Sequence, residues 1–301
     1  MLEKMFKLKE NNTSFRTEVV AGLTTFMAMA YILAVNPNIL SATGMNPDAI
    51  LLATALASFV GCMAMALLAN YPFALAPGMG LNAYMAFTVC GNMGYSWQIA
   101  LLAVFVEGLI FIVLSLTNVR EAIFNAIPMA LKKGVSAGIG LFIAFIGLQG
   151  ANLVVNDDST LLTYVKFVGD FHTIGIGALL ALIGLFIIVV LHHKNIKGSI
   201  LIGILATWIL GMICEAIGLY VPDGKDFYSL YPTFRMIDFG AFGTTFGQCF
   251  NVDFSGVDIL NFIAVLFAFL FVDIFDTLGT LIGVSTKANM LDDCLLYTSD
   301  A

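Results

Sequence analysis

Charged residues are scarce in this 301-residue chain, at 11% of the total, against about 25% in ordinary soluble domains. Hydrophobic residues make up 60%, and the mean hydropathy is +0.96. A soluble protein of this length keeps roughly a quarter of its unfolded-chain surface exposed, so it could not hide this much apolar surface from water. The composition excludes a soluble enzyme and a disordered chain, and the net charge of −7 disfavours a nucleic-acid binder. It indicates a polytopic membrane protein.

Signals for metals, disulfides and cleavable targeting segments are also missing. The five cysteines form no C-x-x-C or Cys/His cluster, and His172, His192 and His193 lie outside the apolar runs. We therefore expect no disulfide, no metal and no cofactor. The Lys-rich N-terminus runs directly into an apolar segment without a small-residue cleavage pattern, so we expect no cleavable signal peptide.

Long apolar runs are abundant, and a spanning helix needs about 20 predominantly apolar residues. Seven runs fit regular spans: Val19–Val35, Ile50–Ala69, Ile99–Leu116, Gly134–Leu148, Ile174–Leu191, Ser199–Tyr220 and Ile259–Val284. An eighth, Phe73–Cys90, stands third in chain order. It contains or adjoins Pro72, Pro77, Gly78 and Gly80, so we expect this segment to be broken.

The basic residues predict the orientation of these eight segments. With the N-terminus inside, ten of the thirteen Lys and Arg residues fall on the cytoplasmic side and three outside, as the positive-inside rule requires. This predicts a multi-pass protein of the plasma membrane with residues 1–18 in the cytoplasm. Residues 221–257 form an external loop that we expect to pack at the membrane surface.

Only four acidic residues fall within the predicted spans: Glu107, Glu215, Asp273 and Asp276. A charge inside a span costs at least ~2.5–3.5 kcal/mol, so each one is a functional hypothesis. Glu215 lies near the end of its span and can reach the interface, which favours a structural role. Glu107 lies at the centre of its span and is either hydrogen-bonded between helices or part of a proton path.

Asp273 and Asp276 carry the strongest signal. Their i, i+3 spacing places both carboxylates on one helix face, together with Phe269. Two such close carboxylates in a low dielectric cannot both ionise cheaply, so the pair can bind a proton and accept an N–H from a ligand. The alternative is that the pair only caps or contacts another helix. Phe269, one turn earlier, either stacks on a flat ligand or is ordinary packing.

The broken segment carries the second signal. Irregular backbone at membrane depth is tolerated where it lines a cavity or is buried in protein. Pro77, Gly78 and Gly80 suit an extended piece followed by a half-helix beginning near Met79, whose free N–H groups can bind a substrate carbonyl or ring nitrogen. Asn82 adds a donor and an acceptor. The alternative is tight helix packing around small residues.

Five ordered motifs carry a family resemblance: Arg16–Phe26, Tyr31–Pro37, Ala76–Tyr84, Gly138–Gly147 and Phe271–Leu281. Over roughly residues 14–292 the chain resembles the AzgA-like purine permeases, a branch of the nucleobase–cation symporters. The resemblance implies an all-α fold of seven plus seven segments in inverted repeats, with interleaved core and gate parts. It also implies proton-coupled uptake of adenine, guanine or hypoxanthine, with substrate contacts at Asn82 and Asp273 and with Asp276 close by.

On this resemblance, residues 19–220 form the first repeat and residues 258–292 the eighth segment, and the tail 293–301 does not resemble the family. We expect an incomplete permease that does not transport alone; purine uptake by the chain itself would require a homodimeric site.

The expected partners are a purine, a proton and the lipid bilayer. Two other functions stay open at this point: an anion transporter of the same architecture, and a membrane-embedded aspartyl hydrolase. Paired aspartates disfavour anion binding, and a hydrolase would place its two aspartates on different helices.

Overall fold

The computed structural model of the chain describes residues 6, 8, 13–117, 128–167, 170–223, 227–232, 236–254 and 257–287. The predicted tail 293–301, most of the predicted cytoplasmic segment 1–18 and the end of the eighth segment lie outside the described residues, as do parts of the 221–257 loop. The chain divides into two compact units. One comprises Met1–Tyr31 and Ala144–Met236, and the other comprises Ile32–Ile143 and Ile237–Ala301.

The described residues include six helices long and apolar enough to cross a membrane: Phe15–Ser41, Pro47–Ala69, Trp97–Leu116, Phe171–His193, Ser199–Ala216 and Ile259–Thr277. Large apolar side chains on these helices are exposed, as at Phe59 (63%) and Phe186 (69%). Such surfaces suit lipid rather than water. The prediction of a mostly helical, polytopic membrane protein is confirmed.

Two of the eight predicted segments are not among the six long apolar helices found in the described residues. Helix α8 (Met129–Gly150) contains the predicted run Gly134–Leu148, and its part Ala137–Gly150 is a shorter apolar helix. The other exception is the broken third segment, described below.

Polar side chains set where several helices begin. Asn46 caps α4 (Pro47–Ala64), where its side-chain oxygen accepts from the backbone N–H of Asp48 at 2.9 Å and Pro47 occupies the first helical position. Ser96 caps α6 (Trp97–Leu116) through the N–H of Ile99, at 3.5 Å. These caps satisfy N–H groups that a helix leaves without partners.

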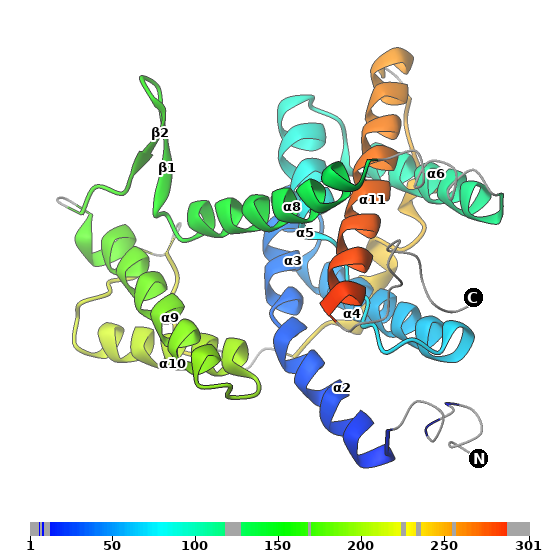
Figure 1. Ribbon diagram of the computed structural model, residues 1–301. Coiled ribbons are helices and arrows are strands. Elements are labelled where there is room, and N and C mark those ends of the chain that lie inside the picture. The colour runs from blue at the N-terminus through cyan, green and yellow to red at the C-terminus, as the bar shows by residue number, and fades with distance from the viewer. Residues whose placement is uncertain are drawn as a thin grey trace. The chain divides into compact units, whose positions relative to one another are not determined.

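The unit that contains Ile32–Ile143 is built around α3 (Ile32–Ser41), α4, α6 and α11 (Ile259–Lys287). Helix α3 packs on α4, and α11 packs on α6 (Figure 1). The fully buried side chains at the centre of this unit are Val89, Val265 and Phe269. Two short 3₁₀ helices of the 221–257 loop, Phe239–Thr244 and Gln248–Phe250, pack on α4 and α6.

The third segment is broken, as predicted. The π-helical turn Met65–Ala69 ends at Asn70, which has a left-handed backbone (φ 52°), and residues 71–78 form no helix. A short helix, α5 (Met79–Ala83), begins at the predicted residue and continues as the π-helical segment Tyr84–Asn92. Pro77 and Gly78 account for the break, because proline lacks an N–H and glycine favours non-helical backbone.

The other unit contains α2 (Phe15–Met29), α9 (Ile176–His193) and α10 (Ser199–Ala216). Helices α9 and α10 lie side by side (Figure 1). Glycines permit this approach: a Cβ at Gly184 would overlap Thr207, and a Cβ at Gly203 would overlap Ile188.

A two-stranded antiparallel hairpin, β1 (Val154–Asp157) and β2 (Leu161–Tyr164), interrupts the helical pattern and was not predicted. Its turn is held by the Asp157 carboxylate, which accepts from the backbone N–H groups of Ser159 and Thr160, each at 2.9 Å. These hydrogen bonds favour the charged form and hold the pKa of Asp157 below its ordinary value.

Glu215 has the structural role that the sequence favours. Its carboxylate accepts from the Ser229 hydroxyl at 2.6 Å and from the Leu230 N–H at 2.7 Å. The nearby indole N–H of Trp208 donates to the Leu230 carbonyl at 2.8 Å. Glu215 therefore ties the described residues 227–232 to the end of α10.

Candidate functional site

A polar network of Asn36, Thr54 and Asn82 links the broken segment to two helices. The Asn82 side-chain amide donates to the side-chain oxygen of Asn36 in α3. The Asn36 amide in turn donates to the Thr54 hydroxyl in α4, at 2.7 Å. Asn36 and Thr54 are each 3% exposed. Three elements therefore fix the direction in which Asn82 presents its amide.

Sequence reasoning assigned no role to Asn36 or Thr54. The available signal was a side-chain amide within an otherwise apolar helix, directly before Pro37. A buried amide is costly without hydrogen-bond partners, so its presence there predicts a network.

The start of α5 lies against an acidic side chain of α11. Gly78, the N-cap residue, has extended backbone (φ −74°, ψ 123°), and no side chain among the described residues caps the helix. A Cβ added at Gly78 would lie only 2.9 Å from Oδ2 of Asp276. A Cβ added at Gly80, in the first turn, would lie 3.3 Å from the ring of Phe142. Glycine at these two positions lets the acid and the ring approach the backbone.

Glu107 of α6 joins the two aspartates of α11, and we call Glu107, Asp273 and Asp276 the acid group. Glu107 is 6% exposed, and its Oε1 is buried without a hydrogen-bond partner in the part of the chain that the structure describes. It lies close enough to Asp273 for the two carboxylates to interact electrostatically. The half-buried Asp276 follows one turn after Asp273. Helices α6 and α11 thus bring Glu107 close to Asp273, which lies 166 positions later in the sequence.

Phe269 lies in the packed interior beside this site. Its side chain is 1% exposed, and its ring packs edge-on against Tyr84, with the ring centres 5.2 Å apart and the planes at 78°. Stacking of Phe269 on a ligand stays a prediction. The observed contacts are those of a core residue that fixes α11 against the third segment.

The arrangement offers hydrogen bonds rather than metal or nucleophilic chemistry. Among the described residues, no group of three or more His, Cys, Asp or Glu side chains is placed to hold a metal ion. Asn82 can donate and accept, the first N–H groups of α5 (from Met79 and Gly80) can donate, and the acid group can accept an N–H or exchange a proton. Such a set fits a flat polar heterocycle with alternating N–H and C=O groups at its edge.

Comparison with known proteins gives the family. The profile of the Permease family matches residues 16–293. The guanine/hypoxanthine permease PbuO of Bacillus subtilis is 45% identical over 293 residues, which cover 95% of this chain and 63% of PbuO. The adenine permease AdeQ of Escherichia coli is 38% identical over 293 residues, which cover 97% of this chain and 61% of AdeQ.

The chain therefore spans less than two thirds of the length of these relatives. The matched region contains the Asn36–Thr54–Asn82 network and the whole acid group. A hydrolase is not supported, since the relatives are named as permeases and not as enzymes. The chain belongs to the Permease family.

Proposed function

We propose that the protein takes up purine nucleobases across the plasma membrane in symport with protons. The observation that carries this proposal is the meeting of the broken third segment with the acids of α11, seen in the contact of Asp276 with Gly78. The names of PbuO and AdeQ, which specify guanine, hypoxanthine and adenine, support a purine as the substrate class.

Purine binding follows from the chemistry of the site. A purine has a planar edge of N–H, C=O and ring-nitrogen groups between two apolar faces. Asn82, fixed by its network, can pair with one donor and one acceptor on that edge. The N–H groups of Met79 and Gly80 can donate to a carbonyl or ring nitrogen, and Asp273 can accept an N–H. Phe269 supplies apolar surface behind the site.

Proton coupling is assigned to the acid group. Close carboxylates at low dielectric resist simultaneous ionisation, so the group holds a proton when no substrate compensates the charge. Glu107 and Asp273 interact across two helices, and Asp276 lies at the half-helix start. A substrate N–H that binds one carboxylate would change the affinity of the other carboxylates for a proton. Substrate binding and proton binding would thereby be coupled.

The proposed topology places residues 1–18 in the cytoplasm and residues 221–257 outside. Residues 19–220 then form the first repeat of a seven-plus-seven inverted-repeat carrier, and residues 258–292 begin the second. The ten basic residues on the cytoplasmic side support this orientation.

The test is substrate uptake in cells that lack purine permeases. Because the chain covers 63% of PbuO, it is joined to the part of PbuO that it does not match, and this fusion is called the hybrid. We expect the hybrid to take up radiolabelled hypoxanthine, guanine or adenine saturably and to leave sulfate outside. Uptake of sulfate would instead identify an anion transporter.

Variants of the hybrid test whether this chain supplies the site. Asn82→Ala removes the amide. Because the loss of one hydrogen bond costs about 1.4 kcal/mol, uptake at limiting substrate should fall at least about tenfold. Asn38→Ala, on the exposed side of α3, is the matched control and should keep normal uptake. Normal uptake by Asn82→Ala would contradict the assignment of the site to this chain.

A further inference from the structure

A proton that crosses the membrane with a substrate needs a titratable group within a span, away from the water on either side. Glu107 is such a group. It is residue 11 of the 20 in α6 and lies near the middle of that helix. It is 6% exposed, whereas Asp273 and Asp276 are each partly exposed. Glu107 is therefore the member of the acid group that is most fully removed from solvent.

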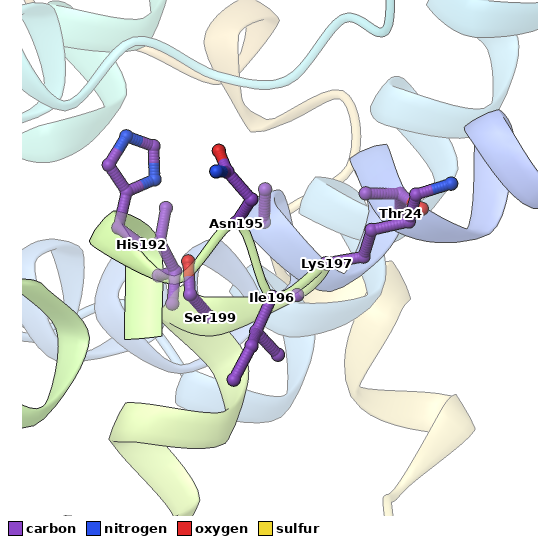
Figure 2. A pocket seen from close by; sticks show the side chains of 9 residues that line it. Thr24, His192, Asn195, Ile196, Lys197 and Ser199 are labelled. Carbon is purple, nitrogen blue, oxygen red and sulfur yellow. The ribbon is translucent and has the colours of Figure 1, made fainter. Parts of the chain in front are cut away.

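The cavity of about 290 Å³ beside α2 offers no comparable group (Figure 2). It lies in the unit that contains α2, α9 and α10, and the titratable side chains of its described lining are His192 and Lys197. Both are exposed, and they lie at the end of α9 and in the connection to α10. Exposed groups at helix ends exchange protons with the water on one side of a membrane only, so they cannot carry a proton across.

The unpaired oxygen of Glu107 indicates the form in which this side chain exists. Its Oε1 is buried and has no hydrogen-bond partner among the described residues. No lysine or arginine occurs within Trp97–Leu116 or within Ile259–Thr277, so neither helix supplies a positive charge there. A buried carboxylate that lacks such a partner is strongly unfavourable, because it has lost its hydration and gained no compensating contact. The Glu107 carboxyl group therefore holds a proton in this arrangement.

The elements that pack against α6 bring no positive charge to Glu107 in the part of the chain that the structure describes. Helix α11 brings Asp273, which is close enough for an electrostatic interaction, and Asp276 one turn later. These acids oppose a further negative charge on Glu107. The π-helical segment after α5 and the second 3₁₀ helix also pack on α6, and their titratable groups are phenol and thiol groups: Tyr84, Cys90 and Cys249.

Asp273 is placed for a different task. It is partly exposed, and it shares a helix face with Asp276, which lies against Gly78 at the start of α5. Close carboxylates at low dielectric resist joint ionisation, so a proton on Glu107 leaves Asp273 free to stay ionised. An ionised carboxylate has only acceptors and can receive an N–H, whereas a protonated one also presents an O–H donor.

We propose that Glu107 carries the transported proton while the ionised Asp273 accepts the substrate N–H. This inference rests on the proposed function and adds to it the residue at which the proton travels. The Glu107 carboxylate takes the proton from water on one side of the membrane and returns it to water on the other side. No other bond forms or breaks in this step.

Desolvation of the site couples the proton to the substrate. A purine on Asp273 replaces a water hydrogen bond of that carboxylate with its own N–H, but it also excludes water from the neighbouring Glu107. Loss of the Glu107 proton is therefore less favourable with a purine bound than in an empty, hydrated site. Because binding linkage is reciprocal, protonation of Glu107 raises the affinity for purine by the same factor.

The experiment uses the purified hybrid in liposomes and measures two quantities. The first is exchange of labelled for unlabelled purine at equal pH on both sides, which gives a KM without net proton movement. The second is accumulation of purine under an imposed proton gradient. In the unchanged hybrid we expect the exchange KM to fall at least about fivefold between about pH 8 and about pH 5, the lower end of typical coupling between two sites.

Glu107→Gln should separate the two quantities. The amide stays neutral like the protonated carboxyl group, so the exchange KM should remain within about twofold of the acid value at every pH, while accumulation is lost. Asp273→Asn removes the acceptor carboxylate and should raise the exchange KM at least about tenfold at every pH. Glu18→Gln, the same change at an exposed acid of α2, is the matched control and should leave both quantities unchanged.

Glu107→Asp provides a second measurement that does not depend on how the amide packs. It keeps an acid at a different distance from Asp273, so accumulation should persist and the pH at which the KM falls should move. An unchanged pH dependence in this variant would overturn the inference.

Normal accumulation by Glu107→Gln would also overturn it, because the proton would then travel elsewhere. Loss of exchange in Glu107→Gln at a normal amount of protein would do the same, since Glu107 would then belong to the substrate contacts. These results leave the proposed function intact as long as the unchanged hybrid concentrates purine. Failure of the unchanged hybrid to do so would overturn both.

Discussion

Replacement of Asn36 by alanine tests how the candidate site is built. Asn36 accepts from Asn82 and donates to Thr54, so Asn36→Ala removes two hydrogen bonds and leaves two polar groups without these partners. Each orphaned buried group costs about 1–3 kcal/mol. Thr54 can turn its hydroxyl to a backbone carbonyl of its own helix, which lowers its contribution to this cost. We expect a loss of about 2–4 kcal/mol in unfolding free energy.

Asn36→Ala should also weaken substrate binding, separately from its effect on folding. Without Asn36, the Asn82 amide loses its fixed direction, and a hydrogen bond that must first be oriented is weaker. In the hybrid we expect the KM for purine uptake to rise about tenfold while the amount of protein at the membrane stays near that of Asn38→Ala. Asn36 is thus a positioning residue that acts through Asn82.

A double-mutant cycle supplies the decisive number. If Asn36 acts through Asn82, the two alanine substitutions should be non-additive, with a coupling energy between about 0.5 and 3 kcal/mol in transition-state binding from kcat/KM. Additive effects would refute the reasoning, because Asn36 would then influence uptake independently of Asn82.

Three further changes test separate parts of the structure. Gly78→Ala places a methyl group 2.9 Å from the Asp276 carboxylate, which must shift, and should lower purine uptake by the hybrid, whereas Gly108→Ala, whose Cβ would meet no atom within 4 Å, should not; equal activity of the two would contradict the close contact. Phe269→Ala should lower the unfolding free energy by about 3–5 kcal/mol, because the ring is fully buried; unchanged stability with a tenfold loss of affinity would identify a stacking residue instead. The pKa of Asp157 is lowered by hydrogen bonds from Thr160 and Ser159, so its stabilisation of the hairpin is present above the carboxyl's ordinary pKa and is lost as pH falls through the lowered value. Hydrogen exchange at the hairpin amides should show this loss of protection on acidification, and Asp157→Asn should remove the pH dependence.

Local sequence rules predicted the features that depend on neighbouring residues. Pro77 and Gly78 placed the start of the half-helix at Met79, where the structure has it, because both residues act on their own backbone. The length of apolar runs located most of the spans, and the i, i+3 spacing of Asp273 and Asp276 needed only helical geometry.

Features that depend on distant residues could not be predicted in the same way. The partner of Asn82 is 46 positions away, and nothing near Asn36 specifies which helix its amide will meet. The hairpin at Val154–Tyr164 has strands of four residues, too short for an alternating pattern to distinguish them from a loop. The burial of Phe269 depends on how α11 meets Tyr84, which only the folded chain reveals.

The most direct test of the central claim is accumulation of purine by the purified hybrid in liposomes under an imposed proton gradient. The unchanged hybrid should concentrate purine toward the alkaline side. Asp273→Asn should abolish accumulation, and Asp276→Asn should reduce it or alter its pH dependence. Asp158→Asn, an exposed change in the hairpin turn, is the control and should accumulate purine normally. If the double variant of Asp273 and Asp276 still concentrates purine with unchanged pH dependence, the acid group does not couple transport to protons.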